Sequence, residues 1–472
     1  MEPYRGAMPG DSSRTGPAEP DAHASAQLPR VLGPFDAVAM VVGGIIGSGI
    51  FLKPGVVASE LGSFGLIISV WIFVGFITLC GALTLAELAA MLPHAGGPYV
   101  YLREAFGRLP AFLWGWTELS IIRPGSVGAL ATATVIYLNE IVPMNRHWQE
   151  ATAIGIVIFL SIVNVVGTRW GAAVQNLTVV AKLVFLVFII ALPFAMSPSQ
   201  PIKTAPWPDE FSLSIFRGLG MAMIAVMWPY DGWINIAPVA EEIREPQRNV
   251  PLGLALGMAI VIVVYVLANV AYHAVLSIPD IARSEAVAHD MCTALLGEKA
   301  GKLVSLGVLC STFGAANSNL LTGPRIYFAM ARDGLLPASI RRVHGRWQTP
   351  ANAIWLQGGW TIVLIVAAYA WEADPRDAFD ALTDFVIFGG SLFYALAVAS
   401  VFVFRRRHPE WQRPYRTIGY PVTPCLYLLG ISAALASMLV DKFTSTLAGT
   451  VLIAAGVAFF FWARKRTHWQ VQ

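Results

Sequence analysis

Charged residues are scarce in this chain. Only 13% of its 472 residues are Asp, Glu, Lys or Arg, against about 25% in ordinary soluble domains. Hydrophobic residues make up 56%, and the mean hydropathy is +0.61. This composition excludes a large water-soluble core. The net charge of +3 is too small to indicate a nucleic-acid partner.

Cysteine and histidine are also sparse. The four cysteines (Cys80, Cys292, Cys310 and Cys425) lack the spacing of a metal site, and the eight histidines are scattered. The sequence contains no HExxH, G-x-S-x-G or Walker motif. We therefore expect neither an enzyme nor a metal or cofactor site.

Long apolar runs, in contrast, fill most of the chain. A helix needs about 20 apolar residues to cross a bilayer. We predict twelve such spans, at residues 35–62, 65–92, 110–140, 150–167, 171–196, 211–240, 250–276, 300–330, 350–370, 378–404, 419–440 and 444–463. The predicted fold is an all-α polytopic membrane protein in a lipid bilayer.

The ends of the chain are polar. Residues 1–30 have no apolar run, so we predict a disordered tail and not a signal peptide. Residues 464–472 form a second tail. The placement of Lys and Arg, including the cluster Arg405-Arg406-Arg407, puts both tails in the cytoplasm.

Two of the predicted helices are interrupted in their middle. In the first span the interruption is Gly47-Ser48-Gly49, and in the sixth it is Trp228-Pro229-Tyr230-Asp231-Gly232-Trp233. Glycine and proline both break a helix, and unpaired backbone groups persist at membrane depth only where they line a protein cavity. The breaks are five spans apart, which predicts two five-helix units of opposite orientation with a binding site between them.

These segments belong to an ordered set of motifs that resembles the amino acid–polyamine–organocation (APC) superfamily, in its L-type amino acid transporter branch. The motifs are GGIIGSGIF at 43–51, AEL at 86–88, PHAGGPY at 93–99, WTELSIIRP at 116–124, Tyr230 with Gly232-Trp233, PQRNVP at 246–251, GAANSN at 314–319 and RIYF at 325–328. The resemblance covers roughly residues 31–465.

The resemblance implies a five-plus-five inverted repeat in residues 31–404 (the LeuT/APC-type fold) and two additional helices in 405–463. It implies a sodium-independent exchanger of neutral L-amino acids in a plasma membrane, and we expect a bacterial inner membrane. Eukaryotic members bind a single-span glycoprotein through a cysteine after the third span. Residues 141–149 contain no cysteine, so we expect no disulfide-linked heavy subunit.

The first break predicts how an amino acid would bind. The amides at Gly47, Ser48 and Gly49 suit a carboxylate, because they precede a half-helix. Carbonyl groups near Ile45 suit the ammonium group. For Gly43 and Gly44 we favour close helix packing instead.

Further site residues follow from the resemblance. Trp228 occupies the position of an aromatic gate over the substrate. Ser126 matches a position that lines the pocket, although a bond from its hydroxyl to its own helix is an equal alternative. We expect Arg123 to be paired at the edge of a membrane-facing cavity, away from the substrate.

Lys182 is a lone ammonium group in the fifth span, and it needs acceptors or must lose its proton. The resemblance implies that it replaces a sodium ion and bridges the first-span carbonyls near Gly44 to the eighth span. Asp231 either faces the pocket, where it would favour a cationic group, or caps the second half of the sixth helix. We favour the cap, and with it neutral substrates.

Three alternatives stay open. Lys182 could couple amino acid uptake to protons, and Asp231 could direct the exchange of cationic amino acids or polyamines. A receptor that binds amino acids without transporting them is the third.

Overall fold

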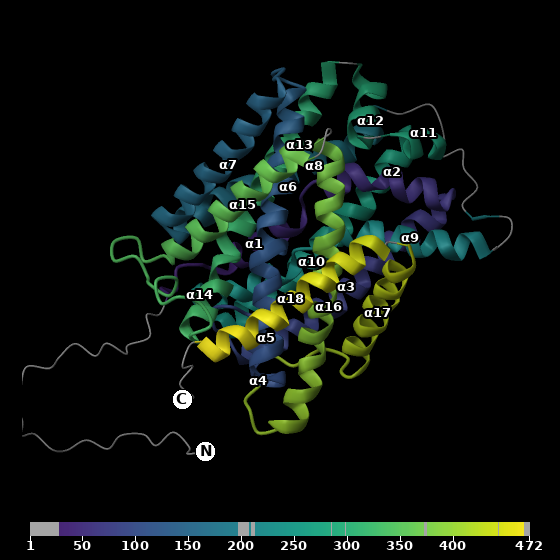
Figure 1. Cartoon of the computed structure of the whole chain (residues 1–472). Helices are drawn as coiled ribbons and strands as arrows, with labels where there is room; N and C mark the ends of the chain where they lie inside the picture. Colours follow the sequence, from purple (N-terminus) through teal and green to yellow (C-terminus); the bar gives the residue numbers. More distant parts are fainter. Residues whose placement is uncertain are drawn as a thin grey trace, which may run out of the picture.

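The computed structural model describes residues 28–196, 207–208, 213–284, 286–297, 299–371, 375–441 and 443–466. Within these ranges the chain is helical and contains no strand, apart from an isolated bridge between Leu32 and Ile243 (Figure 1). The predicted all-α polytopic fold is confirmed. Residues 1–27 and 467–472, which include most of the two predicted tails, lie outside the described ranges.

The first six predicted spans correspond to helices at nearly the same residues. They are α1 (Pro34–Ile45) with α2 (Gly49–Leu61); α3 (Phe64–Met91); α5 (Arg108–Thr117), the π-helical η1 (Glu118–Ile122) and α6 (Arg123–Asn139); α7 (Arg146–Val166); α8 (Thr168–Ala195); and α9 (Leu213–Tyr230) with the 3₁₀-helical η2 (Trp233–Glu242).

The last six spans also have their helices. They are α10 (Pro246–Val275), α13 (Lys299–Thr322) with α14 (Pro324–Arg332), α15 (Ala351–Trp371), α16 (Pro375–Arg407), α17 (Val422–Asp441) and α18 (Phe443–Arg466). Among the described residues, nine helices are long and apolar enough to cross a membrane, and α1 with α2 makes a tenth span bent by 43°. The count of twelve stays a prediction, because the described residues give at most ten spans by length and composition.

The helices end where the local chemistry requires it. Asn145 caps α7 by accepting a hydrogen bond from the backbone N–H of Trp148. Gly62 ends α2 with a left-handed φ of +62°. After α3, the Gly96-Gly97 turn leads into the short helix α4 (Pro98–Phe106).

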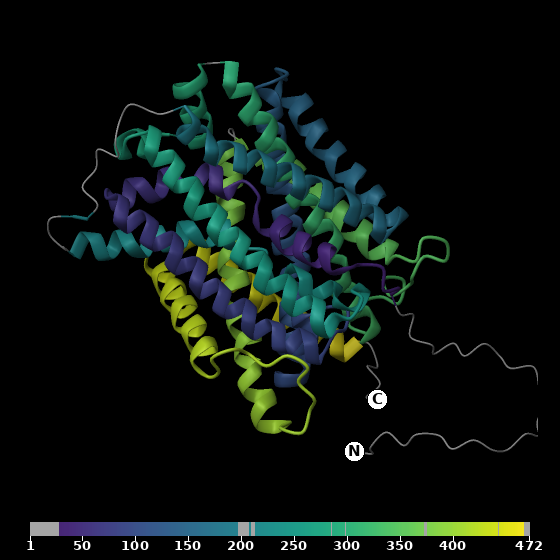
Figure 2. The same cartoon turned by 180° about the vertical axis from the view of Figure 1, so that it is seen from behind.

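The broken helices lie in the middle of the bundle. α1 packs on α10, α8 and η2, and α2 packs on α9. Figures 1 and 2 show α7 and α15 on one side of the molecule and α17 on the opposite side. The interruptions are therefore surrounded by protein, the condition under which broken backbone is tolerated at membrane depth.

Two short helices between α10 and α13 were not predicted from the sequence. They are α11 (Ile278–Arg283) and α12 (Val287–Leu296). Ser277 caps α11 by accepting from the backbone N–H of Asp280, and Cys292 is buried on α12. α11 packs on α2, and α12 packs on α13.

Candidate functional site

The two breaks enclose a cavity of about 390 Å³, which we call the central cavity. Its lining comes from the first break (Gly44, Ile45, Gly47, Ser48 and Gly49), α6 (Ser126 and Leu130), the sixth span (Trp228, Asp231, Gly232 and Asn235) and α13 (Ala315 and Asn319). Every residue for which we predicted substrate contact lines this cavity. The sequence did not single out Gly44, Leu130, Gly232, Asn235, Ala315 or Asn319 as lining residues.

The first break presents backbone donors to the central cavity. The helical bonds of α2 start with the amides of Phe51 and Leu52, which both donate to the carbonyl of Ser48 at 3.1 and 3.2 Å. Amides that precede this point lie outside the helical ladder. Within the described ranges the Ser48 hydroxyl has no hydrogen-bond partner. This group of donors at a helix N-terminus suits an anion.

The sixth span breaks by means of a glycine. Gly232 has a φ of +102°, and a Cβ there would lie only 2.4 Å from the carbonyl oxygen of Gly44. The two breaks therefore touch through their backbones at a point that only glycine fits. Gly44 packs closely against Gly232 and also lines the central cavity. Gly43 packs closely against α8, since a Cβ there would lie 1.9 Å from Nε2 of Gln175.

A tyrosine connects the two breaks. The Tyr265 hydroxyl, from α10, lies 2.9 Å from the carbonyl oxygen of Pro229 and 3.3 Å from that of Ile45. Sequence reasoning missed it, because one tyrosine in an apolar span has no distinctive pattern. Since this hydroxyl already contacts the Ile45 carbonyl, a ligand ammonium would share that oxygen.

Lys182 is fully buried between α1 and α13. Its Nζ donates to the carbonyl oxygens of Ile46 at 2.5 Å, Gly43 at 3.3 Å and Ser311 at 3.1 Å. The Ser311 hydroxyl donates to the carbonyls of Ile46 and Gly47. The ammonium group thus sits at the broken end of α1 and links it to the eighth span.

The sequence of this chain matches the profile of a known protein family. A sequence profile described as "Amino acid permease" matches residues 32–469. The chain belongs to the amino acid permease family, within the APC superfamily.

Known relatives align with nearly the whole permease. The serine/threonine exchanger SteT of Bacillus subtilis (strain 168) is 32% identical over 93% of this chain and 98% of its own length. The human cystine/glutamate transporter is 32% identical over 95% of this chain and 89% of its own length. The human b(0,+)-type amino acid transporter 1 is 30% identical over 93% of this chain and 90% of its own length. The permease is a multi-pass membrane transport protein and not an enzyme.

Asp231 does not occupy the cap position that we favoured, because Gly232 is the N-cap residue of η2. Its Oδ1 accepts a hydrogen bond of 3.0 Å from the Tyr394 hydroxyl of α16. Its carboxylate also accepts the backbone N–H of Gly232, at the start of η2. It nevertheless lines the central cavity together with Trp228, which is 9% exposed.

Arg123 is paired, as expected, but it is not at a cavity edge. It is 2% exposed, its Nε lies 2.5 Å from Glu118, and its Nη1 donates to Asn319 and Thr322. Glu118 begins the π-helical turn η1, which shifts the helix register at this point. The buried pair thereby holds Asn319, whose side chain belongs to the cavity wall.

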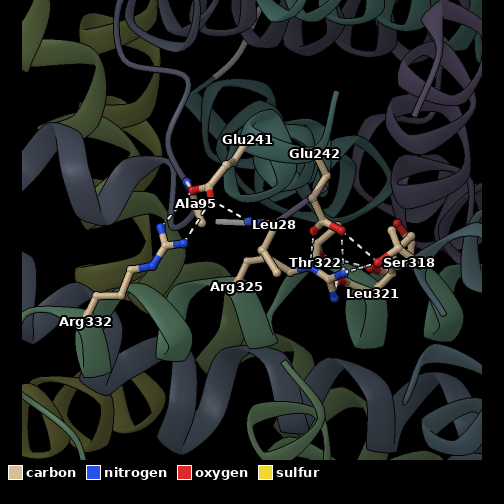
Figure 3. A network of polar contacts seen from close by, with 10 residues as sticks. Leu28, Ala95, Glu241, Glu242, Ser318, Leu321, Thr322, Arg325 and Arg332 are labelled. Atoms are coloured by element: carbon tan, nitrogen blue, oxygen red, sulfur yellow. Dashed lines mark hydrogen bonds and ion pairs between the residues drawn. The ribbon is translucent and has the colours of Figure 1, made fainter. Parts of the chain in front are cut away.

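A polar network around Glu241 connects several segments of the permease (Figure 3). Glu241 receives both Nη atoms of Arg332 at 2.9 Å, together with the amides of Leu28 and Ala95 at 3.0 and 2.9 Å. Burial alone would raise the pKa of Glu241, but these hydrogen bonds outweigh it and hold the pKa below its usual range. One carboxylate thus joins the N-terminal segment, the turn after α3, η2 and α14.

The neighbouring Glu242 forms the second half of this network. It is fully buried and receives the guanidinium of Arg325 at 2.7 Å and the hydroxyl of Thr168 at 2.7 Å. Arg325 also donates to the carbonyl of Leu321. η2, α8 and the α13–α14 junction are therefore connected beside the Glu241 contacts (Figure 3).

Proposed function

We propose that the permease is a sodium-independent exchanger of neutral L-amino acids that works by alternating access. It resides in a plasma membrane, which we take to be a bacterial inner membrane, with both termini in the cytoplasm. The observation that carries the proposal is the central cavity between two helix breaks, with backbone donors on one side and carbonyls on the other.

The two ends of a zwitterion fit this cavity. The carboxylate binds at Gly47, Ser48 and Gly49, and the ammonium group binds at the carbonyl of Ile45. Trp228 closes over the side chain, and Ser126 contributes from α6. The prior engagement of Asp231 by Tyr394 and Gly232 supports a substrate without side-chain charge.

Lys182 supports independence from sodium. A sodium ion would be held by carbonyl and hydroxyl oxygens, because hard cations prefer oxygen ligands. Here the oxygens of Gly43, Ile46 and Ser311 already surround an ammonium group. The protein's own cation fills that place.

The proposal of exchange, as opposed to net uptake, is supported by the relatives. SteT is named as an exchanger and aligns over 98% of its length. The segment between α6 and α7 contains no cysteine, so we propose that the permease acts without a disulfide-linked heavy subunit.

Proteoliposomes provide the test. Labelled leucine, serine and arginine are offered to vesicles with and without internal amino acid, sodium and a pH gradient. Uptake of leucine or serine that needs internal amino acid, but neither ion, supports the exchanger. Accumulation in empty vesicles under a pH gradient would replace exchange by proton coupling through Lys182.

Cationic substrates are the second candidate, because Asp231 reaches the central cavity. Efficient exchange of arginine that is lost in Asp231→Asn, while leucine exchange persists, would favour this candidate. Absence of any transport, with binding of amino acids retained, would point to a receptor.

A further inference from the structure

A second cavity lies on the other side of Asp231, and we call it the side chamber. It has about 570 Å³ of empty space between α3, α9, α16 and α17. Its walls include Met223, Met227, Tyr427, Ile431 and Ala434. The function proposed above does not use this space.

The broken segment of the sixth span is the wall between the two cavities. Trp228 and Gly232 line the central cavity, whereas Tyr230 and Trp233 line the side chamber. Asp231 lines both. Its hydrogen bond with Tyr394, which also lines the chamber, spans the boundary. A group that passes this pair would leave one cavity and enter the other.

The chemistry of the side chamber fits an apolar or aromatic group. Most of its lining side chains are aliphatic, aromatic or methionine, and methionine adapts its shape to different partners. The hydroxyl of Thr78 is already bonded to the carbonyl of Val74 at 2.8 Å. The Asp231–Tyr394 pair is thus the polar contact of the chamber that borders the central cavity.

We infer that the side chamber receives the distal part of large, mainly apolar substrate side chains. The α-amino and α-carboxyl groups stay at the first break, and the side chain enters the chamber beside the Asp231–Tyr394 pair, whose hydrogen bond is kept. This inference rests on the proposed exchange function and makes it more specific. The permease then accepts aromatic amino acids such as tryptophan in addition to small ones, and the chamber sets that limit.

A pair of neighbouring alanines on α17 gives the test. Ala434 is 3% exposed and lines the chamber, whereas Ala433 lies on the exposed face of the same helix. Ala434→Leu fills chamber space, and Ala433→Leu adds the same atoms outside it. Exchange of labelled L-alanine and L-tryptophan is measured in proteoliposomes with each variant and the unmodified permease.

We expect Ala434→Leu to lower tryptophan exchange about tenfold or more relative to alanine exchange, because a few methylenes in a pocket discriminate at that level. Ala433→Leu should leave the ratio unchanged. If Ala434→Leu does not fold, as judged by size-exclusion chromatography, Ser391→Leu fills the chamber from α16.

The outcomes distinguish failure of the side-chamber inference from failure of the proposed exchange function. If the unmodified permease exchanges alanine but not tryptophan, or if a filled chamber leaves the ratio unchanged, the inference is overturned and the exchanger stands. If the unmodified permease exchanges neither amino acid nor any other, the proposed function itself fails.

Discussion

The ammonium nitrogen of Lys182 lies 2.5 Å from the carbonyl oxygen of Ile46, the residue that follows the last turn of α1. Lys182 belongs to α8 and reaches Ser311 of α13 with the same nitrogen. One side chain therefore connects the broken helix to two helices that frame it. The position of the first break depends on this contact.

Replacement of Lys182 tests that dependence. Lys182→Ala should lower exchange at least tenfold, because it removes the cation that holds two carbonyls at the first break and one on α13. Lost hydrogen bonds to a charged group also cost stability, on the order of 2 kcal/mol. The measurements are exchange in proteoliposomes and the thermal midpoint in detergent.

The control for this variant is a test of whether the protein is folded. A single symmetric peak in size-exclusion chromatography shows that reduced exchange comes from the site. Exchange at the unmodified rate in a folded Lys182→Ala protein would contradict the role that we assign to this lysine.

Trp228 provides a second prediction. Its side chain lines the central cavity and is 9% exposed. Trp228→Ala should reduce exchange at least tenfold, because the aromatic cover over the substrate is lost, and Trp228→Phe should retain a substantial part of it. Trp355 is 45% exposed, so Trp355→Ala serves as the matched control. Equal losses in both alanine variants would argue against a gate at Trp228.

The sequence predicted the spans well for a physical reason. A helix in hydrocarbon must be apolar over its whole membrane-crossing length, so the start of α3 at Phe64 and its end at Met91 fall within one residue of the predicted 65–92. The breaks were equally visible, since glycine disfavours a helix, and Gly47 and Gly232 lie in them. Pro229, which we also expected to break the sixth span, lies inside α9, which continues to Tyr230.

Contacts between distant segments were not predictable in the same way. The bond from Tyr265 to Pro229, the hold of Arg123 on Asn319 and the packing of Gly232 on Gly44 each need the folded arrangement. No alternation or spacing in the sequence encodes them. The same is true of Leu28, which falls in the predicted tail but is buried and donates to Glu241.

The Glu241 network predicts a dependence of stability on pH. The pKa of Glu241 is lowered in the folded protein, so its contribution is fully present above the pKa of an unfolded glutamate, about 4.3, and disappears as the pH falls through the lowered value. Glu241→Gln should therefore be less stable than the unmodified permease at pH 7, and the difference should shrink below about pH 4.

Thermal midpoints in detergent between pH 3.5 and pH 8 check this prediction. Glu140 is exposed, so Glu140→Gln should change the midpoint little at any pH. A deficit in Glu241→Gln that stays the same down to pH 3.5 would mean that the charge of Glu241 does not carry the stabilisation.

The contact between the two breaks gives the last prediction, at Gly232. Alanine there meets two obstacles: a φ of +102°, and a carbonyl oxygen of Gly44 only 2.4 Å from the new Cβ. Gly62 has the same left-handed conformation, with a φ of +62°, but no atom within 4 Å of a Cβ. Gly62→Ala thus isolates the cost of the left-handed backbone, about 1–2 kcal/mol. Gly232→Ala should lower the thermal midpoint further and abolish exchange, because the breaks must move apart. If the two variants lose the same stability and both still exchange amino acids, the close approach of Gly44 and Gly232 is not required for transport.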